Sequence, residues 1–218
     1  KLYASQNRVE ANDLADEIIT CLDFDRELVK EYHMIENGWF DGFGLSEHIG
    51  FTTWNCENNK YPQRIYITPV NQPRMIVARI DDENYLTGGF WSEKPQVWKD
   101  ALRPDVNKIE FEIACGSVMP IFYEIESECS WLSFSSVKGE VAKTERIEVY
   151  IDKQQLKERV KGCFSISNVG HGKATVFIEA EPEEPSFSKN VFLETDGYVT
   201  MEASHFMEKR DLEKGGFE

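Results

Sequence analysis

The sequence contains four histidines, His33, His48, His171 and His205, whose spacing fits no known metal or catalytic motif. It has no H-E-x-x-H zinc motif, no G-x-S-x-G nucleophile turn, no P-loop and no dinucleotide fingerprint. Carboxylates are plentiful, but only folding could bring two of them to the separation that acid–base hydrolysis of a sugar linkage requires. The residues by themselves therefore indicate no catalytic centre, no metal and no cofactor.

The candidate binding residues are aromatic or lie among aromatic residues. His48 follows a glutamate within an aromatic, glycine-rich stretch at residues 39–54, and Trp54 ends that stretch. Trp54, Trp91 and Trp98 have flat apolar rings that could stack on a sugar. The simpler alternative is packing, with a histidine hydrogen-bonded in an ordered loop and aromatic rings that fill an interface between domains. On this basis His48, Trp54, Trp91 and Trp98 are the substrate-proximal candidates.

The charge balance narrows the classes of partner. The chain has 39 acidic and 24 basic residues, a formal net charge of −15, spread along its length. Nucleic acid and anionic membrane surfaces are bound through lysine and arginine, so we expect neither as a partner. No window approaches the ~18 consecutive apolar residues of a membrane span, and no signal peptide is visible. With 41% hydrophobic and 12% aromatic residues, the chain can build a core of its own.

The five cysteines are widely and irregularly spaced, at positions 21, 56, 115, 129 and 163. No C-x-x-C occurs, and an odd number cannot pair completely within one chain. Free thiols in a reducing compartment, and hence a cytoplasmic location, are favoured, while export with one or two disulfides stays open.

Helical spacing predicts two helices before residue 38. The first carries its apolar residues at Leu14, Ala15, Ile18, Ile19 and Leu22. A second is predicted to begin at Asp23 or Asp25, either of which can cap a helix, and to end at Asn37-Gly38. Two helices of this length cannot bury both apolar stripes alone. We interpret them as the last pair of a helical bundle.

From Arg74 onward the apolar residues recur with period two, which is typical of strands with one face in a core. Ile109, Phe111 and Ile113 alternate with Lys108, Glu110 and Glu112, and similar runs follow at 121–125, 147–151, 164–166 and 174–180. Short strands with turns every ~8–12 residues predict an immunoglobulin-like antiparallel β-sandwich. Trp131, the largest apolar residue near the middle, is predicted to fill its core.

Together these patterns predict a mainly β chain with four regions. Residues 1–54 form the end of the helical bundle and an aromatic connector, and residues 55–71 form a polar linker. The sandwich occupies residues 72–182. Residues 183–218 follow an acidic, proline-containing stretch and begin a second β-sandwich similar to a carbohydrate-binding module. The chain as a whole has the character of a segment of a longer protein.

Three strings in this order resemble glycoside hydrolase family 115, the xylan α-1,2-glucuronidases. Gly38-Trp39 with HIGFTTW at residues 48–54 is similar to the end of that family's helical domain, although a lysine is missing and Phe51 stands for a tyrosine. The strand at 109–116, the Pro-Ile-Phe step at 120–122 and the tryptophan with its serine-rich turn at 130–139 match the part that follows. Ala114-Cys115 replaces the family's asparagine and basic residue.

The third string, YVTMEASHF at residues 198–206, is similar to the opening of the family's C-terminal sandwich. In related modules a Glu-Ala-Glu there can bind a structural Ca²⁺. Glu202 matches the first carboxylate and is a weak calcium candidate, but Ser204 replaces the second. The loss of one anionic oxygen ligand weakens such a site, so no metal is expected.

The resemblance implies a parent hydrolase that removes (4-O-methyl-)glucuronic acid side groups from xylan with inversion. The family's catalytic carboxylates lie in a (β/α)8 barrel N-terminal to everything seen here, so no catalytic residue is assigned to this chain. Its expected role is non-catalytic: it would scaffold that barrel domain or help to assemble a homodimer, in contact with xylan or glucuronoxylan oligosaccharides. The alternative is a stand-alone carbohydrate-binding or cell-surface interaction module, with Trp91 and Trp98 as its exposed stacking platform.

Overall fold

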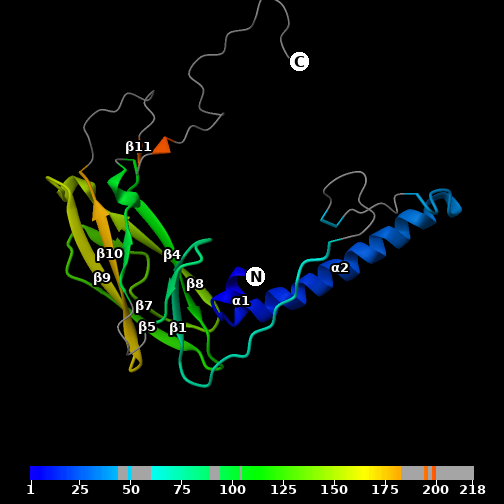
Figure 1. The fold of residues 1–218 in the computed structure, drawn as a ribbon, viewed down its shortest axis with the longest axis horizontal. Coiled ribbons are helices and arrows are strands. Elements are labelled where there is room, and N and C mark those ends of the chain that lie inside the picture. The colour runs from blue at the N-terminus through cyan, green and yellow to red at the C-terminus, as the bar shows by residue number, and fades with distance from the viewer. Residues whose placement is uncertain are drawn as a thin grey trace, which may run out of the picture.

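Two facing β-sheets, built between Met75 and Ala180, form the body of the computed structural model (Figure 1). The structure describes residues 1–43, 49–50, 60–88, 94–103, 105–182, 194–195 and 198–199. Apolar side chains alternate along most strands, and the buried ones face the space between the sheets. The apolar residues at every second position therefore form the inward faces of the two sheets, which share one core.

The first sheet has the order β2-β1-β4-β8-β6, made of Tyr85–Leu86, Met75–Arg79, Lys108–Cys115, Thr144–Ile151 and Leu132–Phe134. The second has the order β3-β10-β9-β5-β7, made of Gln96–Trp98, Gly172–Ala180, Val160–Asn168, Ile121–Ser127 and Lys138–Val141. All neighbours are antiparallel except β3, which runs parallel to β10. The connectivity, with β1, β4 and β8 facing β5, β9 and β10, is that of an immunoglobulin-like sandwich. The predicted fold class is confirmed.

The centre of the core is a trio of aromatic rings contributed by both sheets. Trp98, Phe111 and Phe164 have ring centroids 5.5 to 5.8 Å apart. The prediction that Trp131 fills the core is wrong, because its side chain is only partly buried and packs at the margin. There the indole covers Gly162, whose missing side chain leaves the space that the ring occupies. Trp98 takes the central place instead.

One long helix precedes the sandwich, where two were predicted. After a short turn of helix, α1 (Leu2–Ser5), α2 runs without interruption over Glu10–Met34. Asp23 caps no second helix; its carboxylate accepts a hydrogen bond at 2.7 Å from Arg26 on the helix surface. A 3-10 turn, Ile35–Asn37, follows and ends at Gly38 with φ of 89°. The α-helix thus ends at Met34, three residues before the predicted stop at Asn37-Gly38, where only the 3-10 turn ends. The predicted break near residue 24 is wrong.

The helices are fixed to the outer face of the first sheet by backbone and by charge. The amide of Val9 donates to the carbonyl of Cys115 at 2.9 Å. Arg8 Nη1 donates to Glu112 Oε2 at 2.5 Å, and the two side chains are 1% and 6% exposed. Glu112 was expected on a solvent-facing strand surface, but α1 and the start of α2 cover it. The burial of both faces also explains why β1 is apolar at four consecutive positions.

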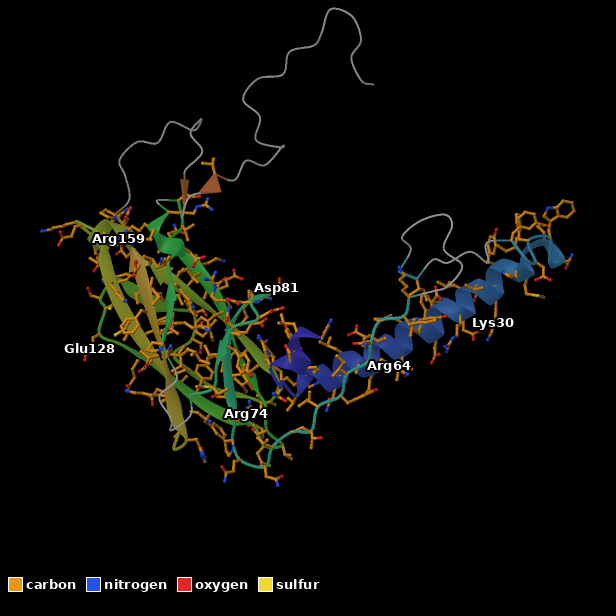
Figure 2. All side chains as sticks on the ribbon, viewed as in Figure 1. Lys30, Arg64, Arg74, Asp81, Glu128 and Arg159 are labelled. Atoms are coloured by element: carbon orange, nitrogen blue, oxygen red, sulfur yellow. The ribbon has the colours of Figure 1, made fainter. Side chains whose placement is uncertain are left out.

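The predicted linker at residues 55–71 is anchored in its described part. Asn12 of α2 exchanges two hydrogen bonds with the backbone of Ile67, at 2.8 and 3.1 Å, and Tyr66 donates to Asp16 at 2.8 Å. Figure 2 shows this segment, marked by Arg64, running beside α2 toward the sandwich. Residues 60–70 are thus a strap that ties the helix to the strand β1. The short strands β11 (Glu194–Thr195) and β12 (Tyr198–Val199) pair with each other further along.

The buried pair Arg8–Glu112 gives a first prediction. Glu112→Ala leaves a buried guanidinium without its anion, which we expect to lower the free energy of unfolding by about 3–5 kcal/mol. The double variant Arg8→Met/Glu112→Leu removes both charges and keeps apolar volume, so it should lie within about 1–2 kcal/mol of the natural chain. Urea denaturation of the natural chain, Glu112→Ala and the double variant measures both values. A double variant as unstable as Glu112→Ala would contradict the ion-pair explanation.

The contact between Gly162 and Trp131 gives a second prediction. A Cβ atom at position 162 would lie 2.4 Å from Trp131 Cζ2 and 2.6 Å from Cys129 Sγ. We expect Gly162→Ala to cost about 1–3 kcal/mol through overpacking. In a background that already carries Trp131→Ala, the same substitution should cost less, because the indole is gone and only Cys129 Sγ remains close to the new Cβ. Equal costs in both backgrounds, measured by thermal unfolding, would show that the ring is not the obstacle.

Candidate functional site

A groove of about 710 Å³ lies at one end of the sandwich, where strands β1, β2 and β3 meet a 3-10 turn, η2 (Asp100–Leu102). Its volume is in the range of small-ligand sites. The turn after β1, marked by Asp81 in Figure 2, leads into one wall. The side chains that line it are largely polar or charged: Arg79, Asp82, Asn84, Tyr85, Leu86, Lys94, Gln96, Val97, Trp98, Lys99, Asp100 and Arg103.

An arginine–carboxylate pair forms part of the groove lining. Arg79 donates two hydrogen bonds to Asp100, Nη1 to Oδ2 at 2.7 Å and Nη2 to Oδ1 at 3.0 Å. The same guanidinium carbon lies 5.3 Å from the ring centroid of Trp98, within cation–π range. Burial raises the pKa of Asp100, but the hydrogen bonds and positive charge of Arg79 outweigh it, so the pKa lies below its ordinary value. Arg79 Nε is buried and has no hydrogen-bond partner among the described residues.

The groove has an excess of positive charge. It is lined by four basic side chains, Arg79, Lys94, Lys99 and Arg103, and by two acidic ones, Asp82 and Asp100. Arg103 is also paired with Asp105, which lies outside the lining, through bonds of 2.7 and 3.1 Å. Sequence reasoning missed this cluster because Arg79 ends β1, whereas Lys94, Lys99 and Arg103 lie in one irregular stretch around β3 and η2 that no local pattern joins to it. The parallel pairing of β3 with β10 that places Lys94 and Lys99 here leaves no trace in local periodicity.

The substrate-proximal candidates are not brought together in the described part of the chain. His48, Trp54 and Trp91 lie outside the described residues, as does the calcium candidate Glu202. Trp98 is described and is 4% exposed, with its ring packed on Phe111 and Phe164. Its indole Nε1 donates to Gln96 Oε1 at 3.0 Å. The expectation that Trp98 offers an exposed ring for a sugar is therefore wrong; only its margin reaches the groove.

The second feature of note is an exposed apolar stripe on α2. Leu14, Cys21, Phe24, Leu28 and Tyr32 recur at spacings of seven, three, four and four residues, which places them on one side of the helix. Leu14, Phe24, Leu28 and Tyr32 are 39%, 65%, 47% and 39% exposed. The strap covers a different side, where it contacts Asn12 and forms a groove of about 720 Å³ with Ile19 and Leu22. The stripe is an apolar surface that the described part of the chain leaves open to solvent.

The remaining reactive side chains form no second site within the described ranges. His33 Nδ1 lies 3.2 Å from Asp41 Oδ1 at the far end of α2, and His171 sits at the tip of the β9–β10 hairpin. No group of three or more His, Cys, Asp or Glu side chains in these ranges is arranged to hold a metal ion. The described cysteines at 21, 115, 129 and 163 are all unpaired. In the same ranges, no helix combines the length and the apolar character that crossing a membrane requires.

No protein-family model matches the sequence, and no curated protein does. Among solved structures, part of the chain is similar to a Porphyromonas gingivalis W83 protein of unknown function, with 11% identity over 53% of this chain and 49% of that one, TM-score 0.37. It is also similar to a Bacteroides ovatus GH5 xyloglucanase in complex with an XXXG heptasaccharide, with 12% identity over 46% and 20%, TM-score 0.35. The Pseudomonas aeruginosa CupB2 chaperone matches with 9% identity over 42% and 54%, TM-score 0.32. Likenesses of this size carry no argument about function.

The lowered pKa of Asp100 predicts a dependence of stability on pH. A carboxylate whose folded pKa is depressed stabilises the fold above its ordinary pKa of about 3.9, and this contribution is lost as the pH falls through the folded value. Asp100→Asn should therefore lower the free energy of unfolding by about 1 kcal/mol near neutral pH, after allowance for solvent screening. The difference from the natural chain should shrink toward about pH 2. A difference that stays constant across this range, in parallel urea titrations, would contradict the ion-pair origin.

Proposed function

We propose that this chain is a non-catalytic scaffolding part of a glycoside hydrolase that removes (4-O-methyl-)glucuronic acid side groups from xylan. The three ordered sequence resemblances support the family and its substrate class. In this proposal the hydrolytic carboxylates belong to a barrel domain elsewhere in the parent protein. The chain contributes a rigid joint: a sandwich with a long helix fixed to its outer face.

The observation that carries the scaffolding role is the exposed apolar stripe of α2. The first turns of the helix are held by the sandwich through Val9 and Arg8, whereas Phe24, Leu28 and Tyr32 lie further along it. Lys30, which lies between Leu28 and Tyr32 in the sequence, is well away from both sheets in Figure 2. Apolar residues at helical spacing over about five turns would gain by packing against another helix. The proposed occupant is a helix from the rest of the parent hydrolase.

The charges beside the stripe support such a helix over a second copy of α2. By helical spacing Glu17 falls within the stripe, between Leu14 and Cys21, and Glu31 falls at its edge. Two copies packed through this face would bring like charges together, which destabilises helix pairs. A partner helix with Lys or Arg beside its apolar residues would neutralise them instead. We therefore place the parent's own helical region, rather than a homodimer, on this surface.

The alternative, a stand-alone carbohydrate-binding or cell-surface interaction module, is less well supported. It rests on Trp91 and Trp98 as an exposed platform, and Trp98 is a core residue here. Trp98→Ala would remove a central ring of the aromatic trio, so a loss of sugar binding in that variant would report unfolding. Trp91→Ala is the informative substitution for this alternative, measured by affinity electrophoresis in glucuronoxylan. Retardation by the natural chain that Trp91→Ala abolishes would favour the binding module.

The scaffolding proposal predicts a division of labour between chain and parent. The 218-residue chain should release no glucuronic acid from aldouronic oligosaccharides, and the full-length parent should release it. In the parent, Phe24→Asp/Leu28→Asp places two charges in the apolar contact and should lower the melting temperature by several degrees, with a matching loss of activity on heating. The same pair should change the stability of the isolated chain little, because both side chains are already exposed.

The matched control is Lys30→Ser, a charge change on another side of the same helix. It should leave the parent's melting temperature nearly unchanged. Release of glucuronic acid by the isolated chain would refute the non-catalytic role. Equal melting temperatures for the parent with and without the two aspartates would refute the helix contact.

A further inference from the structure

The groove between β1, β3 and η2 has a net charge opposite in sign to that of the whole chain. The chain has a formal net charge of −15, yet the groove lining has four basic and two acidic side chains. Arg79 is matched by Asp100, and Arg103 by Asp105. Lys94 and Lys99 then share the groove with one further acid, Asp82, so one positive charge is left in excess. Neither lysine forms an ion pair with any other residue in the described part of the chain. Lys99 also lowers the pKa of Glu179, as a lesser contribution after the hydrogen bond from Arg159.

The surroundings of these lysines favour an oxyanion. The Arg79–Asp100 pair and the margin of Trp98 give the groove a polar lining next to the apolar core. Lysine ammonium groups bind carboxylate and phosphate oxygens as point charges, with little demand on geometry. Arg79 also retains a buried Nε without an acceptor among the described residues. A buried donor of this kind points to an acceptor supplied by water or by a ligand.

The size of the groove and the charge of the chain limit the ligand. A long polyanion such as nucleic acid would be repelled by the chain's net charge of −15. A volume of about 710 Å³ suits a small molecule. Lys94 precedes β3 and Lys99 lies between β3 and η2. Because β3 is the edge strand of the second sheet opposite β7, the site is confined to one edge of the sandwich.

We propose that this groove binds a small anionic ligand through a carboxylate or phosphate group held by Lys94 and Lys99. This site is independent of the scaffolding role, since it uses none of the residues of the apolar stripe. The ligand's charged group lies between the two ammonium groups, and its body lies over the Arg79–Asp100 pair. Binding neutralises the local charge and requires no movement of the core.

The test is titration of the ¹⁵N-labelled 218-residue chain with two anions, D-glucuronate and inorganic phosphate, and with glucose as the neutral probe. We expect saturable shifts of the Val97, Trp98 and Lys99 amides with at least one anion, and none with glucose. Lys94→Gln and Lys99→Gln should each weaken binding about fivefold, as for the loss of one exposed charge pair. Raising the salt from about 20 mM to about 500 mM should weaken it further by screening. The anion bound more tightly identifies the group that the site prefers.

The matched control is Lys138→Gln, the same charge change on β7, the opposite edge strand of the second sheet. Its affinity should equal that of the natural chain. Both groove lysines are exposed, so their variants should keep the natural melting temperature, which confirms that they fold. Three results would overturn the proposal: no saturable shift with either anion, glucose bound as tightly as the anions, or an effect of Lys138→Gln as large as that of the groove lysines.

Discussion

The buried ion pair between Arg8 and Glu112 is the interaction on which the arrangement of this chain depends. Two charges taken out of water are tolerated only when each satisfies the other, so the pair permits one position of α1 on the sheet. Glu110 shows the contrast, because it lies on the same face of β4, two residues away, and pairs with Lys108 at the surface. The exposed Arg146 reaches both carboxylates, at 3.8 and 3.7 Å. The difference between the two glutamates is the helix that covers one of them. The ring of Tyr3, 4.3 Å from the Arg8 guanidinium, completes the cover.

Once α1 is fixed, the direction of α2 follows. The helix leaves the sheet within its first two turns, and the strap returns beside it to reach β1 (Figure 1). The start of the helix and the end of the strap are therefore both attached to the sandwich. The strap is hydrogen-bonded to one side of the helix, at Asn12 and at Asp16. The apolar stripe, in contrast, is covered by no neighbouring segment in the described ranges. A helix braced in this way presents its free side at a defined angle to the sandwich, as the proposed scaffolding role requires.

The sequence predicted the strands well, because most strands bury one face and so alternate apolar and polar residues along the chain. It could not tell Trp98 from Trp131. Both are large rings beside strands, and only the pairing of β3 with β10 puts Trp98 between the sheets. It also missed the burial of Glu112, since a glutamate on the polar side of an alternating strand is normally solvated and its partner lies 104 residues away. The Arg79–Asp100 pair was missed because β1 and η2 come together only through the pairing of the sheets, which local periodicity does not record. Local patterns decided the architecture, and contacts between distant segments decided the sites.

The anchor and the groove are connected through the turn that follows β1. Gln6 of the anchoring segment is buried, and its Nε2 donates to the carbonyl of Asp82 at 2.7 Å. Asp82 in turn lines the groove, and its side chain caps Asn84 at 2.8 Å. The position of this wall is thus set by the same segment that carries Arg8. A ligand in the groove and a partner on α2 would act on one rigid body through this turn. The two surfaces share a support while their contact residues stay separate, so each can be altered without removing the other.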